Sequence, residues 1–429
     1  MARSLFWASF FIVLIAFSPL AVRAEDAKIP DTDWPKFRGP NGDGVSSTSG
    51  LLKEWPQGGP PIVWKSEPIG SGFSSVSMAG KRIFTMGDDK GSSWVFALDR
   101  ATGKKEWSAR VGKSGGNNAG TRCTPTVDGD LVYGIGQFGD LVCLEAASGR
   151  EKWRKSFVND FGGKAGGWNY TESPLVDGDK LVCTPGGQKK AAMVALDKKS
   201  GAVIWESDFG ETAGYASMVI SEAGGVRQYV QLLSGGVAGV SARDGKLLWR
   251  FHDKDGTKNY FARNTANIPN PVVLGDYIFA GAGYGTGAGL LKLAASGSGV
   301  KEEWIYFKQN LKSRHGGYVV LGEYVYADSD DSGRPFCAKW RTGEIQWKRD
   351  GDFEGSGSVS ITYADDRLYM HYDNGYIALV EANPRMYKEC GGFKIPNSIS
   401  QSWSHPVVVG GNLYLREKNV LWCYDVRAK

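Results

Sequence analysis

After Phe17 the sequence has no second long hydrophobic run, and its charges almost cancel. The 429 residues hold 51 Lys and Arg against 46 Asp and Glu, a net charge of +5. A chain so close to neutral is not built around the phosphate neutralisation that drives nucleic-acid binding. The sequence also lacks a Walker loop, a His-Glu-x-x-His pair and a nucleophile elbow. It therefore carries no motif for nucleotide binding, zinc proteolysis or serine hydrolysis. Catalysis by acid and base groups that separate segments bring together is not excluded.

The first 24 residues differ from the rest of the chain. Arg3 precedes an apolar run over residues 5–17, and small residues lead up to Ala24. This pattern is typical of a secretory signal peptide cleaved before Glu25. The run is shorter than the roughly 20 residues of a membrane span, and no Cys follows the cleavage point to carry a lipid. We predict a periplasmic or secreted protein with no integral membrane segment after cleavage.

Glycine and aromatic residues are abundant, with 59 Gly, 15 Trp and 18 Tyr. Many belong to one repeated pattern, in which an apolar run is followed by an Asp, a Thr-Gly or Ser-Gly pair and a Trp. VFALDRATGKKEW at residues 95–107 recurs as LVCLEAASGREKW, as MVALDKKSGAVIW and in weaker copies. The tryptophans, 43 to 55 residues apart, are Trp107, Trp153, Trp205, Trp249, Trp304 and Trp347. That period fits one four-stranded blade of a β-propeller.

Each repeat predicts four antiparallel strands. Two alternating apolar segments joined by Asp-Gly or Gly-Asp, as in PTVDGDLVYGI, form the first two, since these dipeptides supply the positive φ angles of a tight hairpin. The run before the Asp is the third strand and the segment ending in Trp is the fourth. Eight such first strands can be counted. Because one sheet cannot bury both faces alone, we predict an all-β, eight-bladed propeller over residues 60–429.

The two ends of the chain predict how the ring closes. The last repeat ends at Lys429 before a fourth strand, whereas residues 61–65 place Trp64 in a strand that belongs to no complete repeat. We expect this N-terminal strand to complete the eighth blade. Residues 25–59 are expected to form an extension packed on the ring, and each repeated Trp is expected to dock its blade on the next.

The Asp-x-x-Thr-Gly-x-x-x-Trp pattern resembles the tryptophan-docking motif of propellers of the pyrroloquinoline quinone (PQQ) type. WPKFRGPNGDGVS at residues 34–46 likewise resembles the opening of secreted PQQ-like repeat proteins. That family includes quinoprotein alcohol dehydrogenases and the scaffold lipoprotein of the bacterial outer-membrane barrel-assembly machinery. The resemblance implies the propeller fold and leaves function open, because one fold hosts many activities.

Two functions follow from this resemblance. The first is a non-catalytic binding or assembly scaffold, monomeric, with a protein or small-molecule partner. The second is a PQQ-dependent oxidoreductase acting on alcohols or sugars, with PQQ over the channel and calcium beside it. The sequence lacks the adjacent Cys pair of the alcohol dehydrogenases and a Cys-x-x-Cys-His haem motif, and their calcium-binding acid and amide residues have no match. The first function, with no cofactor and no metal, is therefore the preferred prediction.

The segments that lead into the eight first strands, here called the lead-in segments, are expected to gather at one mouth of the central channel. Their polar and aromatic residues are Arg122, Trp168, Asn169, Tyr170, Glu172, Tyr215, Asn267, Arg314, His315, Trp403 and His405. Such a mixture suits a sugar, a quinone or a peptide, although propeller mouths are polar in any case. All except Tyr170, Glu172 and Tyr215 are candidates for binding a ligand or cofactor.

Glu172 is the candidate catalytic acid if the protein is an enzyme, because it is the only carboxylate in the lead-in set. Two histidines without a third ligand do not define a metal site.

The cysteines divide into two groups. Three of them share one third-strand position and are interpreted as small core residues, namely Cys143, Cys337 and Cys423. The pairing of Cys123, Cys183 and Cys390 stays open, since an exported protein permits disulfides.

Overall fold

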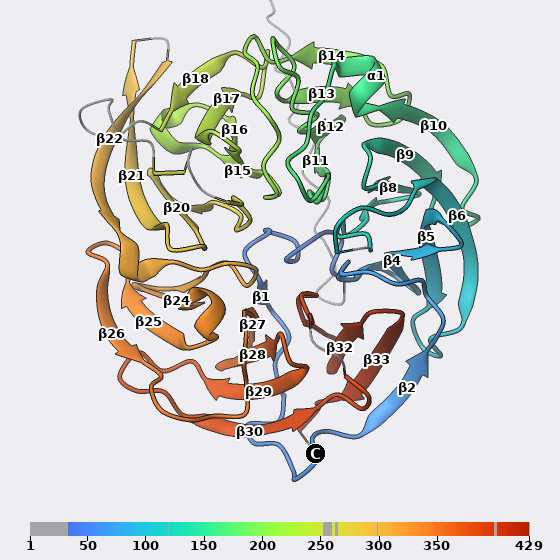
Figure 1. The fold of residues 1–429 in the computed structure, drawn as a ribbon, viewed down its shortest axis with the longest axis vertical. Helices are drawn as coiled ribbons and strands as arrows, with labels where there is room; N and C mark the ends of the chain where they lie inside the picture. Colours follow the sequence, from blue (N-terminus) through green and yellow to red (C-terminus); the bar gives the residue numbers. More distant parts are fainter. Residues whose placement is uncertain are drawn as a thin grey trace, which may run out of the picture.

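The chain forms a ring of four-stranded antiparallel blades around a central channel (Figure 1). The computed structural model describes residues 33–118, 120–251, 260–261, 265–297, 299–398 and 401–428. Eight sheets are present in these residues, so the predicted all-β, eight-bladed propeller is confirmed. The predicted signal peptide lies outside the described residues.

Blades 1 to 4 follow one another along the chain, and in each the strands pair in sequence order. Blade 1 is β3 (Ser77–Ala79), β4 (Arg82–Asp89), β5 (Ser92–Asp99) and β6 (Lys105–Lys113). Blade 2 is β7 (Thr126–Asp128), β8 (Leu131–Ile135), β9 (Asp140–Glu145) and β10 (Glu151–Ser156). Blade 3 is β11 (Leu175–Asp177), β12 (Lys180–Cys183), β13 (Val194–Asp197) and β14 (Val203–Glu206). Blade 4 is β15 (Val219–Ser221), β16 (Gln228–Leu233), β17 (Gly236–Ser241) and β18 (Leu247–Arg250).

The second half of the ring continues the order. Blade 5 is β19 (Val272–Leu274), β20 (Tyr277–Ala282), β21 (Gly287–Ser296) and β22 (Gly299–Lys308). Blade 6 is β23 (Val319–Leu321), β24 (Tyr324–Asp328), β25 (Pro335–Lys339) and β26 (Glu344–Lys348). Blade 7 is β27 (Val359–Ala364), β28 (Arg367–Tyr372), β29 (Tyr376–Glu381) and β30 (Glu389–Lys394). Blade 8 contains β31 (Val407–Val409), β32 (Asn412–Glu417) and β33 (Val420–Asp425). The helical pieces are α1 (Phe157–Phe161) and the 3₁₀ turns Ala223–Gly225, Gln309–Leu311 and Asp330–Ser332.

Two N-terminal strands belong to the last two blades. β2 (Ile62–Ser66) pairs antiparallel with β33, so the eighth sheet has the order β2-β33-β32-β31. β1 (Val45–Ser46) pairs in parallel with β27 and adds a fifth strand to blade 7. Strands from both ends of the chain thus share the eighth sheet.

Residues 33–46, here called the channel segment, run through the middle of the ring (Figure 1). Trp34 is 2% exposed and forms a bridge with Met78 of β3. The hydroxyl of Ser46 donates to the carbonyl of Val408, at 2.6 Å, in the first strand of blade 8. The extension expected to pack on the ring therefore contacts the first strands that line its channel.

A tryptophan of one blade lies against the turn glycine of the next at four junctions. Trp107 Nε1 donates to the carbonyl of Ala146 at 3.2 Å, and a Cβ on Gly149 would stand 2.5 Å from the Trp107 ring. The same relation joins Trp64 to Gly103, Trp153 to Gly201 and Trp205 to Gly245. The φ angles of these glycines lie between +69° and +73°. Only glycine adopts this left-handed conformation without strain and also leaves space for the indole ring.

Blade 5 departs from the predicted pattern. Trp304 packs edge-on against Phe251, with ring centroids 4.5 Å apart, instead of reaching blade 6. Tyr306 makes the forward contact, since its hydroxyl donates to the carbonyl of Trp340 and its ring lies beside the turn glycine Gly343. A β-bulge separates the two residues, because Tyr306 pairs with Leu290 and Trp304 pairs with the next residue, Leu291, so their side chains point to opposite faces of the blade. The bulge therefore places Tyr306 where Trp304 was expected.

All six cysteines are buried and free. Cys143, Cys337 and Cys423 lie in the third strands β9, β25 and β33, as the repeat alignment predicted. Burial raises the pKa of each of these three thiols to about 12. They therefore act as small apolar core residues.

Replacing the turn glycine tests the contact between blades. Gly149→Ala should lower the free energy of unfolding by about 1–2 kcal/mol for the positive φ, and by a further 1–3 kcal/mol, roughly, because the Cβ meets the Trp107 ring. Gly129→Ala is the matched control, since Gly129 has φ +54° and no atom lies within 4 Å of the point that its Cβ would occupy. Urea unfolding should show a larger loss for Gly149→Ala, and equal losses would contradict the contact.

Removing the N-terminal strand tests ring closure. A shortened chain that starts at Ser71 lacks the channel segment and β2, so blade 8 would have an unpaired β33. We expect this chain to lose the single cooperative thermal transition that a chain starting at Glu25 shows. Melting curves followed by circular dichroism compare the two, and indistinguishable transitions would show that β2 does not close the ring.

Candidate functional site

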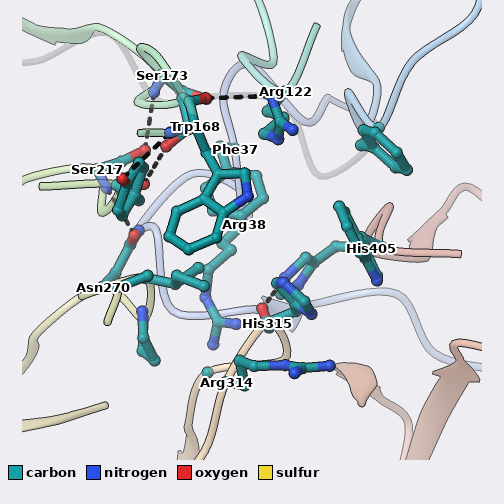
Figure 2. Close-up of a pocket in the computed structure, with 18 of the residues that line it drawn as sticks. Phe37, Arg38, Arg122, Trp168, Ser173, Ser217, Asn270, Arg314, His315 and His405 are labelled. Atoms are coloured by element: carbon teal, nitrogen blue, oxygen red, sulfur yellow. Dashed lines mark hydrogen bonds between the residues drawn. The ribbon is translucent and has the colours of Figure 1, made fainter. Parts of the chain in front are cut away.

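A cavity of about 290 Å³ lies at one mouth of the channel, among the lead-in segments (Figure 2). Its wall combines six aromatic residues with three arginines, two histidines and small hydroxyl or amide side chains. Seven of the eleven residues singled out in the sequence line it, namely Arg122, Trp168, Tyr215, Arg314, His315, Trp403 and His405. Side chains from widely separated blades thus meet at one place.

The other four candidates lie outside the cavity wall and support the loops. The amide of Asn267 donates to the carbonyl of Leu233 at 2.8 Å, and Tyr170 donates to that of Pro185 at 2.8 Å. Asn169 adopts φ +63° in a turn. Glu172 is 3% exposed, and its carboxylate accepts the backbone N–H of Thr184 at 2.5 Å.

The channel segment contributes two cavity residues that the sequence did not single out, Phe37 and Arg38. Arg38 is 4% exposed and donates to the carbonyls of Gly316 at 3.0 Å and Tyr318 at 2.5 Å, which ties the segment to blade 6. Burial lowers the pKa of Arg38 to about 10, so the guanidinium stays charged at neutral pH. The only sequence signal was the WPKFRGP stretch, which carries no information on where the segment runs.

A second cavity of about 370 Å³ lies between the channel segment and the first strands of blades 3 to 5. The two cavities share four lining residues, which are Phe37, Ser173, Ser217 and Asn270. Phe37 also packs edge-on against His405, with centroids 4.9 Å apart. The channel segment therefore forms part of the floor of the mouth cavity.

Three aromatic rings form a stack along one wall. Trp403 lies between Phe73, at 4.4 Å, and His315, at 4.5 Å, and both pairs are stacked. His405 Nε2 lies 3.1 Å from the carbonyl of His315. Burial lowers the pKa of His405 to about 3, with the Arg38 charge adding to the effect, and burial together with Arg314 and Arg122 puts the pKa of His315 well below its usual range. Both imidazoles are therefore neutral at pH 7.

Hydrogen bonds from lead-in segment to lead-in segment hold the rim of the cavity. The backbone N–H of Ser75 donates to Thr124 Oγ1 at 3.0 Å, and that of Thr124 to Ser173 Oγ at 2.9 Å. The series continues from Ser173 to Ser217 Oγ, and from Ser217 to Asn270 Oδ1, at 2.8 Å each. Five successive blades are thus joined by side-chain acceptors at equivalent positions.

The positive charge of the cavity comes from guanidinium groups. Arg122 donates to the carbonyl of Asn118 at 2.8 Å and, at longer range, to that of Trp168 at 3.3 Å. The guanidinium of Arg314 lies over the Tyr284 ring, 5.2 Å from its centroid. The described residues that line the cavity include no Asp or Glu. This donor set suits an anion.

The described part of the chain holds no group of three or more His, Cys, Asp or Glu residues placed to bind a metal ion. Among the same residues, no helix has the length and hydrophobicity of a membrane span.

Comparisons with known proteins agree with the geometry of the ring. A family model described as outer membrane protein assembly factor BamB matches residues 91–349. The quinohemoprotein alcohol dehydrogenase from Comamonas testosteroni is 12% identical, with 93% of this chain and 81% of that chain covered and a TM-score of 0.61. The computationally designed protein Ika8 is 9% identical, with 85% and 100% covered and a TM-score of 0.61.

BamB from Moraxella catarrhalis is 16% identical, with 86% of this chain and 87% of that chain covered and a TM-score of 0.44. No curated protein matches the sequence significantly. At such identities the likeness to solved structures establishes the fold alone.

Glu172 should make stability depend on pH. Burial raises its pKa from 4.5 to about 7, so the folded protein holds this proton more tightly than the unfolded chain. The contribution to stability is then complete below pH 4.5 and is lost as the pH rises through about 7. We expect a loss of up to about 3 kcal/mol. Urea unfolding at pH 5 and pH 8 should show a larger loss in the natural protein than in Glu172→Gln, which keeps only the contribution of other carboxyls such as Asp328, whose pKa burial raises to about 6. The same pH dependence in both would rule out Glu172 as a source.

Proposed function

The chain belongs to the PQQ-like repeat family whose model is described as outer membrane protein assembly factor BamB, and on that premise we propose that it is a non-catalytic binding or assembly scaffold. The channel mouth is the place where it holds its ligand or partner. The signal-peptide pattern of residues 1–24 supports a periplasmic or secreted location. We further propose that it acts as a monomer.

One observation carries this proposal, the convergence of three arginines on a cavity whose described lining holds no carboxylate. Arg38 comes from the channel segment, Arg122 from the lead-in segment of blade 2 and Arg314 from that of blade 6. The N–H groups of Arg38 and Arg122 donate to backbone carbonyls, and their positive charges remain to attract a carboxylate, sulfate or phosphate group. Such a wall binds and orients an anionic group.

The quinoprotein alternative requires PQQ and calcium. The guanidinium groups of Arg122 and Arg314 suit the acidic and quinone oxygens of PQQ, but the lining does not suit calcium, which takes six to eight oxygen ligands that usually include carboxylates. Asn270 Oδ1 already accepts the N–H of Ser217. The candidate acid Glu172 lies outside the cavity wall, with its carboxylate bound to the backbone of Thr184. The donor set therefore fits an anion better than a calcium-bound quinone.

Reconstitution separates the two functions. The purified protein is incubated with PQQ and calcium and then desalted, and the quinone absorbance and dye reduction with alcohols and sugars are measured. We expect no turnover above a heat-denatured control. Retained quinone together with turnover would overturn the scaffold proposal. In that event Arg122→Ala and Arg314→Ala should weaken cofactor binding, and Glu172→Gln should lower turnover if Glu172 is the acid.

A further inference from the structure

The hydrogen bonds around the rim use side-chain acceptors and leave donors on the cavity wall. Ser217 Oγ accepts the N–H of Ser173, and Asn270 Oδ1 accepts the N–H of Ser217. A hydroxyl that accepts still has its own O–H to donate, and an amide that accepts still has its NH₂ group. Ser217 and Asn270 both line the cavity. Oxygen atoms of a ligand would therefore meet neutral donors on this side.

Two arginines add positive charge. The guanidinium groups of Arg122 and Arg38 donate to backbone carbonyls, which satisfy N–H groups without cancelling the formal charge. Arg122 is only half-buried and lies on the wall opposite Arg314 and His315 in Figure 2. The charges of Asp88 and Asp43 act on Arg122 and Arg38 from outside the cavity wall, so an anionic group of a ligand would add the negative charge on the cavity side.

Trp168 supplies an apolar face. Its indole stands at the centre of the cavity in Figure 2 and makes an edge contact with Tyr215, at 5.9 Å between centroids, so it is not stacked on another ring. Trp403, in contrast, is covered on both faces by Phe73 and His315. An aromatic face carries negative partial charge and attracts the polarised C–H groups of a flat ligand ring. A volume of about 290 Å³ leaves room for one such ring.

We propose that the mouth cavity binds an acidic pyranose, a single sugar ring that carries a carboxylate or sulfate group. This ligand class rests on the proposed function and specifies it. The anionic group faces Arg122, the C–H face of the ring packs on Trp168, and hydroxyl oxygens of the ring accept from Ser217 and Asn270 on the other side of that indole. A neutral sugar lacks the anion, and a planar aromatic acid such as benzoate lacks the hydroxyl groups.

Calorimetric titration of the purified, full-length mature protein tests the ligand class. The four probes are D-glucuronate, D-glucose 6-sulfate, D-glucose and benzoate. We expect glucuronate, glucose 6-sulfate or both to bind at least tenfold more tightly than glucose and benzoate. Binding of only one anionic sugar identifies the acidic group as carboxylate or sulfate. If neither anionic sugar exceeds glucose, the proposal is wrong.

Variants locate the binding. Arg122→Met should weaken the anionic sugar at least tenfold and leave glucose unchanged, whereas Trp168→Ala should weaken every sugar that binds. The matched controls are Arg110→Met and Trp94→Ala, which change an exposed arginine of β6 and a half-exposed tryptophan of β5 outside the cavity wall. Unchanged affinity in Arg122→Met with an unaltered melting temperature would overturn the assignment. If a variant fails to fold, the comparison of the four probes on the natural protein still decides.

The two proposals fail in different ways. If no anionic sugar binds and PQQ is neither retained nor turned over, the ligand class is wrong and the scaffold proposal stands. If PQQ is retained with turnover, the scaffold proposal fails, whether or not the anionic sugars bind.

Discussion

The contact between a tryptophan of one blade and the turn glycine of the next is the interaction on which this ring depends. Trp107 fits over Gly149 because the turn has a left-handed φ and no side chain, and its indole N–H finds a carbonyl in the same turn. Each face of a four-stranded sheet is buried only if a neighbouring blade covers it. Repetition of the contact at four junctions orients blades 8, 1, 2, 3 and 4 relative to one another. It also places the turns between third and fourth strands at one end of the ring and leaves the lead-in segments together at the other.

The cavity arises where the repeats diverge. Equivalent positions in the lead-in segments keep a side-chain oxygen, as in Thr124, Ser173 and Ser217, because each must accept the N–H of the preceding blade. Neighbouring positions do not have to accept a backbone N–H, and they hold Arg122, Trp168 and other residues that face the channel mouth. The structural hydrogen bonds and the binding wall are thus built from adjacent residues of the same segments, so the rigidity of the ring is passed directly to the cavity.

The sequence predicted the parts of the molecule that repeat. Period-two alternation and Asp-Gly turns indicated the strands, and alignment of the repeats placed Cys143 in the core and Arg122 at the channel mouth. What could not be predicted depends on single, long-range contacts. No local pattern shows that Phe37 and Arg38 enter the channel, since their partners lie near residue 316 and beyond. Trp304 and Tyr306 both lie in β22, and the pattern could not show the β-bulge between them that decides which one reaches blade 6.

The path of the channel segment determines when its contacts can form during folding. Ser46 bonds to Val408, 362 residues later, so this contact cannot form until nearly the whole chain has been made. Contacts so distant in sequence form late and slow the folding of a domain. The segment is enclosed only when blade 8, the last in sequence, packs against it, so strands from distant parts of the chain complete the ring together.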